Sequence, residues 1–335
     1  MSTSNAMNTM NTFSSSTRFD LEGGDFLDGL KIAYHTYGDL APSGTNVIWI
    51  CHPLTGNSDV MSWWGELVGP GLAIDTDRFF VVCANVIGSC YGSSEPSYSS
   101  FPLVSIRDQV RAFTQLREYL GVSRIACLIG GSMGGQHVME WALVEPDVIE
   151  RIIPIATNAK QSAWAVAFNA AQRLAITADP TFYTNVPGGG AAGLIAARAV
   201  GMLSYRTPVL YNVGQGVDDQ RLQNFPVETY LYYQGAKLRK RFSAYSYYAL
   251  TRSMDSHDVG RGRGSTGEAL RSIRAKALVV GVDTDMLFPE SEQQYIADMI
   301  GGATYRRMTS VSGHDAFLIQ QKALGTIIQQ ARILP

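Results

Sequence analysis

The stretch Gly130-Gly131-Ser132-Met133-Gly134 follows the apolar run 125–129 and precedes a helical pattern over residues 136–143. A strand that passes directly into a helix must turn sharply, and side chains larger than hydrogen would clash at the flanking glycines. The turn holds Ser132 on a strained backbone, with its hydroxyl pointing away from the sheet. The first amide of the helix, that of Met133, is left free to bind an oxyanion. The stretch therefore indicates a nucleophilic serine, with a plain Gly-rich turn capped by serine as the alternative.

The composition is that of a well-packed globular chain. Hydrophobic residues make up 46% of its 335 residues, charged residues make up 17%, and the formal net charge is −2. This balance suggests neither a nucleic-acid partner nor a membrane-surface partner. No apolar run reaches the ~20 residues that span a bilayer. The length allows one large α/β domain or two ordinary domains.

The first 16 residues are polar, rich in Ser, Thr and Asn, and lack the apolar segment of a signal peptide. We expect residues 1–16 to be a disordered leader, partly from an expression tag. The cysteines show no CxxC spacing, and three of them lie in apolar runs; the four are Cys51, Cys83, Cys90 and Cys127. Buried thiols in a reducing cytoplasm are therefore expected rather than disulfides, and no convincing set of metal ligands is found.

Apolar runs rich in β-branched residues alternate with helical patterns, which indicates a mostly parallel sheet with helices on both faces. The expected strands cover residues 31–36, 47–51, 79–84, 125–129, 152–155, 277–282 and 304–308. The expected helices cover residues 106–120, 133–145, 290–300 and 317–334. Together with the serine turn, this order predicts the α/β-hydrolase fold.

Strand patterns stop between residue 160 and about residue 272. The segment has Ala-rich helical faces over residues 164–178 and 191–203 and an aromatic stretch over residues 230–248. Its position before the last two strands is where α/β-hydrolases carry a cap over the active site. We therefore expect a core domain of residues 17–159 and 273–335 and a helical cap of residues 160–272.

A serine hydroxyl needs a base to take its proton and a carboxylate to orient that base. In this fold the chain order is serine, acid, histidine. Of the five histidines, only His257 and His314 follow Ser132 at a useful distance along the chain. His314 comes after the last strand, where a loop at the carboxyl end of the sheet lies beside the serine turn. His257 lies inside the expected cap, so His314 is the predicted base.

The acid is expected at the end of the preceding strand, 277–282. Two carboxylates, Asp283 and Asp285, follow that strand. Asp285 lies deeper in the loop, where its side chain can turn toward His314, whereas Asp283 fits a residue that caps the turn. The second oxyanion amide is expected in the loop after an early strand, residues 52–56, and Leu54 is the candidate to act with Met133.

These motifs together resemble the homoserine O-acetyltransferases. The matching pieces run in order from about residue 30 to the C-terminus and lie at residues 52–56, 63–64, 69–71, 130–135, 258–264, 285–289 and 313–318. The resemblance implies a ping-pong reaction in which Ser132 takes the acyl group from acetyl-CoA, the co-substrate. The hydroxyl of homoserine, deprotonated by His314, would then collect it. No permanently bound cofactor is implied.

The family's homoserine-binding positions correspond to Arg198, Tyr205 and Asp315. A helix through this region places Arg198 and Tyr205, at i and i+7, on one face. A guanidinium binds a carboxylate through two parallel hydrogen bonds, and a carboxylate such as Asp315 suits the ammonium of homoserine. Without the resemblance, Arg198 would be read as a surface residue and Tyr205 as a core aromatic. The resemblance also implies a homodimer joined through cap helices.

Three departures from the family pattern put the acyl donor in question. The stretches at residues 90–102 and 182–190 are short, and Ser243 and Tyr245 stand where the family usually has Asp and Asn. Succinyl-CoA as donor, and serine or a deacetylated antibiotic as acceptor, are the nearest alternatives. An esterase or amidase, in which water takes the acyl group, and a non-catalytic binding protein are the further ones.

Overall fold

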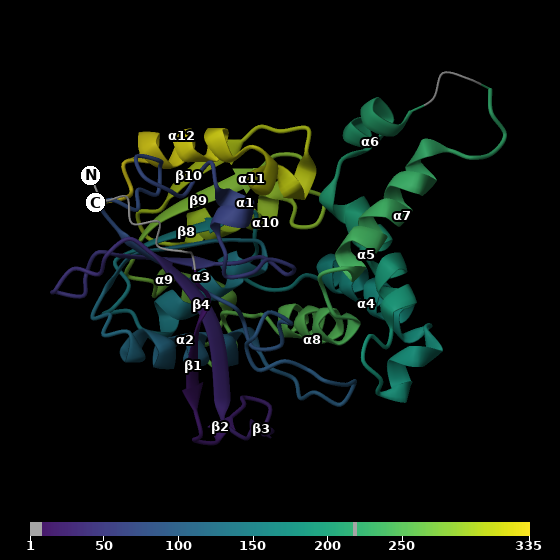
Figure 1. Cartoon of the computed structure of the whole chain (residues 1–335). Coiled ribbons are helices and arrows are strands. Elements are labelled where there is room, and N and C mark those ends of the chain that lie inside the picture. The colour runs from purple at the N-terminus through teal and green to yellow at the C-terminus, as the bar shows by residue number, and fades with distance from the viewer. Residues whose placement is uncertain (1–8, 217–219) are drawn as a thin grey trace, which may run out of the picture.

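The computed structural model describes residues 9–216 and 220–335, which form a central eight-stranded sheet covered by helices (Figure 1). The strand order is β1-β4-β6-β5-β7-β8-β9-β10. The strands are β1 Asn11–Ser15, β4 Leu30–Tyr37, β5 Val47–Cys51, β6 Phe80–Ala84, β7 Ile125–Gly131, β8 Arg151–Ile155, β9 Lys276–Val282 and β10 Thr304–Met308. Strand β4 runs opposite to the other strands of this sheet, so its pairs with β1 and β6 are antiparallel and the remaining pairs are parallel. The expected α/β-hydrolase fold is confirmed, with every expected strand found within two residues of its bounds.

Helices cover both faces of the sheet, because its central strands are apolar on both sides. On β5, for example, Trp49 faces one core and the neighbouring Ile48 faces the other. The first core includes residues of α2 Ile106–Tyr119, α3 Met133–Val144, α9 Thr266–Arg271 and α10 Glu290–Met299. The second includes residues of α1 Met61–Trp64, α11 Ala316–Ile319 and α12 Gln321–Ala331. The single helix expected over residues 317–334 is therefore two helices.

The N-terminal segment corrects one expectation. Residues 11–15 of the expected disordered leader form β1, which pairs antiparallel with β4 from Asn11 opposite Tyr34 to Ser15 opposite Leu30. The polar pattern misled the prediction because β1 is an edge strand, held by its backbone pairing rather than by burial. Residues 1–8 lie outside the described part of the chain. A small hairpin, β2 Phe19–Asp20 with β3 Phe26–Leu27, follows β1.

The segment between β8 and β9 is helical and stands beside the core, coloured teal and green in Figure 1. Its elements are α4 Ala163–Thr177, η1 Pro180–Thr184, α5 Ala191–Tyr205, α6 Pro208–Gln215, α7 Pro226–Arg239 and α8 Ala244–Asp255. We call α4 through α8 the insertion. Glycines let its helices approach closely: a Cβ on Gly193 would lie 2.6 Å from the Ala175 carbonyl oxygen of α4, and one on Gly235 would lie 2.6 Å from Ile195 of α5.

The two ends of the insertion lie side by side. The Gln161 amide donates to the His257 carbonyl at 2.9 Å, and the Val259 amide donates to the Ala159 carbonyl at 3.1 Å. The Lys160 ammonium lies 3.1 Å from the Asp258 carboxylate. Residues 258–271, which were expected within the cap, instead lie against core helices, because α9 packs on α10. The chain thus leaves the core at residue 160 and returns to it near residue 258.

Candidate active site

Ser132 occupies the turn between β7 and α3 with φ of 57° and ψ of −124°, a conformation that non-glycine residues rarely adopt. The turn is tight because a Cβ on Gly130 would lie 2.4 Å from the backbone of Gly134. Two hydrogen bonds hold the strained residue: its amide donates to the Ile155 carbonyl at 2.9 Å, and the Thr157 hydroxyl donates to its carbonyl at 2.8 Å. Such strain at a serine is typical of a functional position.

The structure brings Ser132, His314 and Asp285 together. The Nε2 atom of His314 lies 2.9 Å from the Ser132 hydroxyl oxygen, and its Nδ1 atom lies 2.7 Å from Asp285 Oδ2. All three side chains are buried. This is the geometry in which an imidazole can take the serine proton while the carboxylate fixes its tautomer. We name these three residues the relay.

The two aspartates after β9 differ in position, as expected. Asp285 Oδ1 accepts hydrogen bonds from the amides of Leu287 and Phe288, each at 2.9 Å, which leaves Oδ2 for His314. Asp283 instead accepts a hydrogen bond from the Ser310 amide at 3.1 Å and has no contact with His314 among the described residues. The amide contacts fix the Asp285 carboxylate before any ligand arrives.

The environment of His314 favours its charged form. Burial opposes the charge, but the carboxylate of Asp285, its hydrogen bond, and the more distant Asp315 together raise the pKa of His314 above its ordinary value. The ring also lies among aromatic rings, with centroid distances of 5.3 Å to Phe288 and 5.8 Å to Tyr205. The imidazole is thereby both oriented and shielded from solvent.

The two predicted oxyanion amides lie on elements that touch. A Cβ on Gly134, at the start of α3, would lie 2.1 Å from the Cys51 carbonyl oxygen at the end of β5. The Met133 amide opens α3, and Leu54 is a buried residue in the turn after β5. In the described part of the chain, neither amide donates a hydrogen bond. Both donors are therefore available to a ligand oxygen.

His52 precedes Ser132 in the chain and was therefore not a candidate for the base, but its ring contributes to the loop that carries Leu54. Its Nδ1 atom lies 2.9 Å from the Pro53 carbonyl oxygen, and its Nε2 atom accepts the Val86 amide proton at 3.2 Å. Complete burial lowers its pKa to about 4, although the bond to Pro53 opposes the shift. The ring stays neutral and fixes the loop. No signal in the sequence separated this role from that of an ordinary core histidine.

The three residues expected to bind homoserine lie around α5 and the relay. The Arg198 guanidinium carbon lies 5.2 Å from the centre of the Tyr205 ring, so the two residues share a helix face as expected. Asp315 follows His314 directly, but Arg206 Nε donates to its carboxylate at 3.0 Å. Arg206 was not predicted, and its position directly after Tyr205 gave no sign of this pairing. The roles of Arg198, Tyr205 and Asp315 in substrate binding stay predictions.

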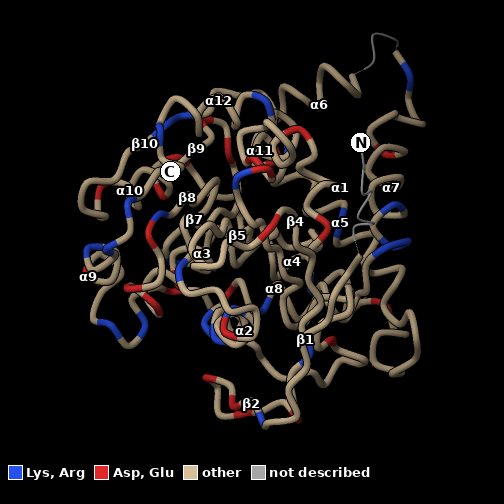
Figure 2. The backbone as a smooth tube through the Cα atoms, turned by 60° about the vertical axis from the view of Figure 1, so that its left-hand side comes forward, with Lys and Arg blue, Asp and Glu red and all other residues tan. Residues whose placement is uncertain are grey.

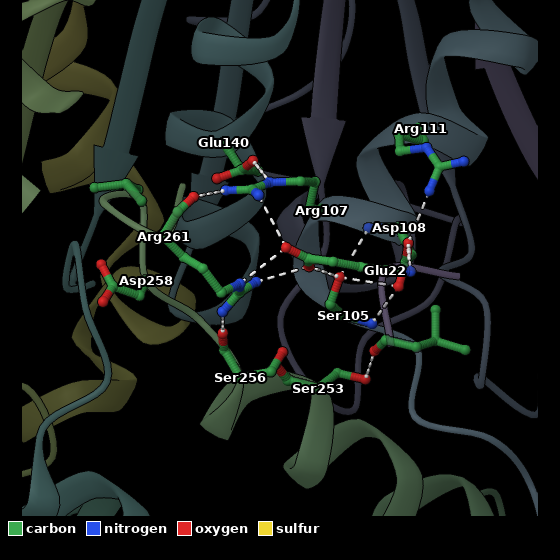
Figure 3. A network of polar contacts seen from close by, with 12 residues as sticks. Glu22, Ser105, Arg107, Asp108, Arg111, Glu140, Ser253, Ser256, Asp258 and Arg261 are labelled. Atoms are coloured by element: carbon green, nitrogen blue, oxygen red, sulfur yellow. Dashed lines mark hydrogen bonds and ion pairs between the residues drawn. The ribbon is translucent and has the colours of Figure 1, made fainter. Parts of the chain in front are cut away.

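The motif at residues 258–264 fastens the chain to the core. Arg261 donates to both carboxylate oxygens of Glu22 at 2.8 Å, and Arg107 donates to Glu22 at 2.8 Å and to Glu140 at 2.6 Å (Figure 3). Arg263 binds both oxygens of Glu140, at 2.6 and 2.9 Å. We call these five residues the ion-pair cluster. The motif thus serves structure, joining the N-terminal hairpin, α2 and α3.

Within residues 9–216 and 220–335, no three potential metal-ligating side chains of His, Cys, Asp or Glu lie close enough to hold an ion. No described helix has the length and apolar character required to span a membrane. All four cysteines are free, and burial raises the pKa of the thiols of Cys51, Cys83 and Cys127.

Comparison with known proteins places the chain in a family. Residues 46–320 match the family model for the alpha/beta hydrolase fold. A homoserine O-acetyltransferase of Cyclobacterium marinum is 43% identical over 319 residues, which cover 92% of this chain and 91% of the relative. The chain belongs to the homoserine O-acetyltransferase family. The enzyme of Moorella thermoacetica with the same description is also 43% identical, over 92% of both chains.

Solved structures extend the comparison within the fold. A homoserine O-acetyltransferase of Staphylococcus aureus is 28% identical, with a TM-score of 0.81 over 96% of this chain and 95% of the other. An acetylester hydrolase of Corynebacterium glutamicum is 25% identical, with a TM-score of 0.84 over 96% of both chains. Transferases and hydrolases therefore share this architecture, and the choice of acyl acceptor must come from the site itself.

Proposed function

We propose that the protein transfers an acetyl group from acetyl-CoA to the hydroxyl of L-homoserine, through an ester on Ser132. The observation that carries the proposal is the continuous contact from Ser132 through His314 to Asp285, at 2.9 and 2.7 Å. The family membership supports the substrates, and the reaction would belong to methionine biosynthesis. Acetyl-CoA is a co-substrate here rather than a resident cofactor.

The first half-reaction forms the acyl-enzyme. His314 Nε2 takes the proton of Ser132 as its oxygen attacks the thioester carbonyl, and the amides of Leu54 and Met133 stabilise the resulting oxyanion. As the intermediate collapses, the carbon–sulfur bond breaks and His314 returns the proton to the CoA thiolate. In the second half-reaction His314 deprotonates the homoserine hydroxyl, which attacks the ester and releases Ser132 with its proton restored.

Arg198 and Asp315 suit the two charged groups of the acceptor. The Arg198 side chain stands against Tyr205, which in turn lies beside the His314 ring. Its guanidinium can bind the homoserine carboxylate through two hydrogen bonds. Asp315 can attract the ammonium, sharing its charge with Arg206. The Tyr205 ring lies beside both the Arg198 guanidinium and the reacting imidazole.

The insertion is proposed to act as the cap of this site. Its helix α5 packs on the short turn that carries His314, and the Trp164 indole of α4 donates to the Met286 carbonyl beside Asp285 at 2.6 Å. A cap of this kind excludes water from the acyl-enzyme, which a transferase requires. Exposed apolar side chains on α5, α6 and α7, including Leu203, Val213 and Tyr232, support a homodimer through cap helices. We also propose a cytoplasmic location, which suits an enzyme of amino-acid biosynthesis.

Hydrolysis of an acetyl ester is the second candidate, favoured by the similarity to the acetylester hydrolase. One assay separates the two. The protein is given acetyl-CoA or succinyl-CoA with L-homoserine, L-serine or no acceptor, and the release of free thiol is followed together with O-acylated product. We expect homoserine-dependent thiol release with acetyl-CoA and one ester formed for each thiol. Thiol release at the same rate without an amino acid would instead establish a hydrolase.

A further inference from the structure

A small cavity lies in the insertion, between α5, α7 and the segment that joins α7 to α8. Its volume is about 100 Å³, and it is lined by Arg198, Gln234, Lys237, Leu238 and Arg241. We call it the cation cavity. Three of its five lining residues carry a positive charge, and no carboxylate is among them. In Figure 2, Lys and Arg positions accordingly lie on α5 and along α7.

The three cations have no acidic partner in the described part of the chain. Arg198 Nε is buried without any hydrogen-bond acceptor. Arg241 donates only to neutral groups, at 2.7 Å to the Thr55 carbonyl and at 2.8 Å to the Tyr91 hydroxyl. Lys237 is exposed and forms no ion pair there. A buried guanidinium nitrogen without an acceptor is costly, so the arrangement suits a ligand that brings negative charge.

Two residues that line the cavity contact neighbours of the relay and of the oxyanion candidate. On one side, Arg198 stands 5.2 Å from the Tyr205 ring, which lies 5.8 Å from the ring of His314. On the other side, Arg241 holds Thr55, the residue after the oxyanion candidate Leu54. An anionic group in the cavity would therefore belong to a molecule that reaches Ser132. Its outer part would remain at the surface, where Lys237 and Arg241 are exposed.

We propose that the cation cavity binds a phosphate group of the acyl-CoA donor, an inference that rests on the proposed function. The acceptor carries a single carboxylate, which Arg198 alone can bind, whereas the donor carries several phosphate charges. With Arg198 left to that carboxylate, the Arg241 guanidinium and the Lys237 ammonium match the oxygens of a phosphate, and the Gln234 amide adds a neutral donor. A volume of about 100 Å³ exceeds the ~30 Å³ that one water occupies, and so leaves room for a tetrahedral anion.

The test compares two acyl donors that differ in phosphate. Acetylation of Ser132 is measured by intact-protein mass spectrometry without acceptor, with acetyl-CoA and with S-acetylpantetheine, which has no phosphate. Lys237→Ala is expected to lower the ratio of the two second-order rate constants, acetyl-CoA over S-acetylpantetheine, by about tenfold, as for one lost charge-assisted contact. Lys237→Glu is expected to lower it further. Arg241 is left unchanged because it also holds the Thr55 loop.

Arg239→Ala is the matched control, since Arg239 is an exposed cation at the end of the same helix and does not line the cavity. It should keep the wild-type ratio. An equal loss on both donors, no loss, or a loss confined to the KM for homoserine would each overturn the proposal. Failure of the proposed function gives a different result, because wild-type protein would then form no O-acetylated homoserine from acetyl-CoA and L-homoserine, whatever the ratio of the two acetylation rates.

Discussion

The ion-pair cluster and the cation cavity each gather three basic side chains, yet only the first contains carboxylates. In the ion-pair cluster, Glu140 is 2% exposed and accepts two arginines, while Glu22 accepts the remaining contacts. In the cation cavity the partners are a carbonyl and a hydroxyl, or none. The presence or absence of carboxylates therefore distinguishes two groups of basic side chains that are similar in number.

Whether a charged side chain has a partner of opposite charge indicates its role in this chain. A paired buried charge is costly to disturb and holds elements in place, whereas we propose that the unpaired cations of the cation cavity bind a ligand. The relay stands between the two cases, because His314 and Asp285 are paired and the proposed function gives the pair a chemical role. Substitutions in the relay should lower turnover, those in the ion-pair cluster should lower stability, and those in the cation cavity should weaken ligand binding.

The largest effect is expected for Asp285→Asn. The amide leaves the shape of the loop intact but can favour the wrong His314 tautomer, so kcat should fall by about 10⁴-fold. Turnover is measured by thiol release, and the fold by circular dichroism and urea unfolding. Asp283→Asn is the matched control, because that residue touches the backbone of Ser310 instead of His314. A comparable loss in the control would show that the loop, rather than the carboxylate of the relay, is responsible.

Breaking the ion-pair cluster should lower the free energy of unfolding and leave turnover per folded molecule unchanged. Glu140→Gln leaves Arg107 and Arg263 without their shared buried carboxylate, and the free energy of unfolding should fall by about 3–5 kcal/mol. Urea unfolding measures the loss, and turnover per folded molecule should stay near that of wild type. Asp147→Asn breaks an exposed pair with Arg274 and should leave the unfolding curve unchanged. Normal stability in Glu140→Gln would refute the structural role of the motif at residues 258–264.

The sequence allowed the positions of the strands along the chain and the relay to be anticipated because both follow from local rules. The spacing of apolar residues, the apolar runs and the glycines around Ser132 locate the strand ends. The carboxyl ends of parallel strands meet at one edge of the sheet. That is why His314 and Asp285, separated by 29 positions, could be paired before their distance was known. The same reasoning placed Arg198 and Tyr205 on one face of a helix.

What could not be predicted depends on contacts between distant segments. Glu22 meets Arg261 across 239 positions, and nothing in either local sequence marks the other as partner. The pairing of Arg206 with Asp315 is of the same kind. Strand β1 was missed because backbone hydrogen bonds to β4, rather than an alternating apolar pattern, hold its polar residues. Unpaired charges such as Arg198 are recognised only once every neighbouring carboxylate has been located.

A smaller effect, confined to one substrate, is expected for Arg198→Ala. Loss of a guanidinium that binds the acceptor carboxylate should lower kcat/KM for homoserine by about 10²-fold. Arg198→Lys should recover part of the loss, because it keeps the charge without the two-pronged geometry. Acetylation of Ser132 by S-acetylpantetheine, which lacks both carboxylate and phosphate, should proceed in both variants. A loss of acetylation as large as the loss of transfer would mean that Arg198 supports the relay.

The smallest effect concerns pH. His314 acts as a base only when neutral, and its pKa is raised above 6.5, so acetylation of Ser132 should already decline as pH falls toward 6.5. Below the raised pKa, the rate should drop about tenfold for each pH unit. Asp285→Asn removes the charge and hydrogen bond that raise this pKa, so its residual rate should decline at a lower pH than that of wild type. The measurement is the acetylation rate against pH for both proteins. An unchanged midpoint would show that Asp285 orients His314 without raising its pKa. The pair would then have a structural role, as the ion pairs of the ion-pair cluster do, and would not tune the base.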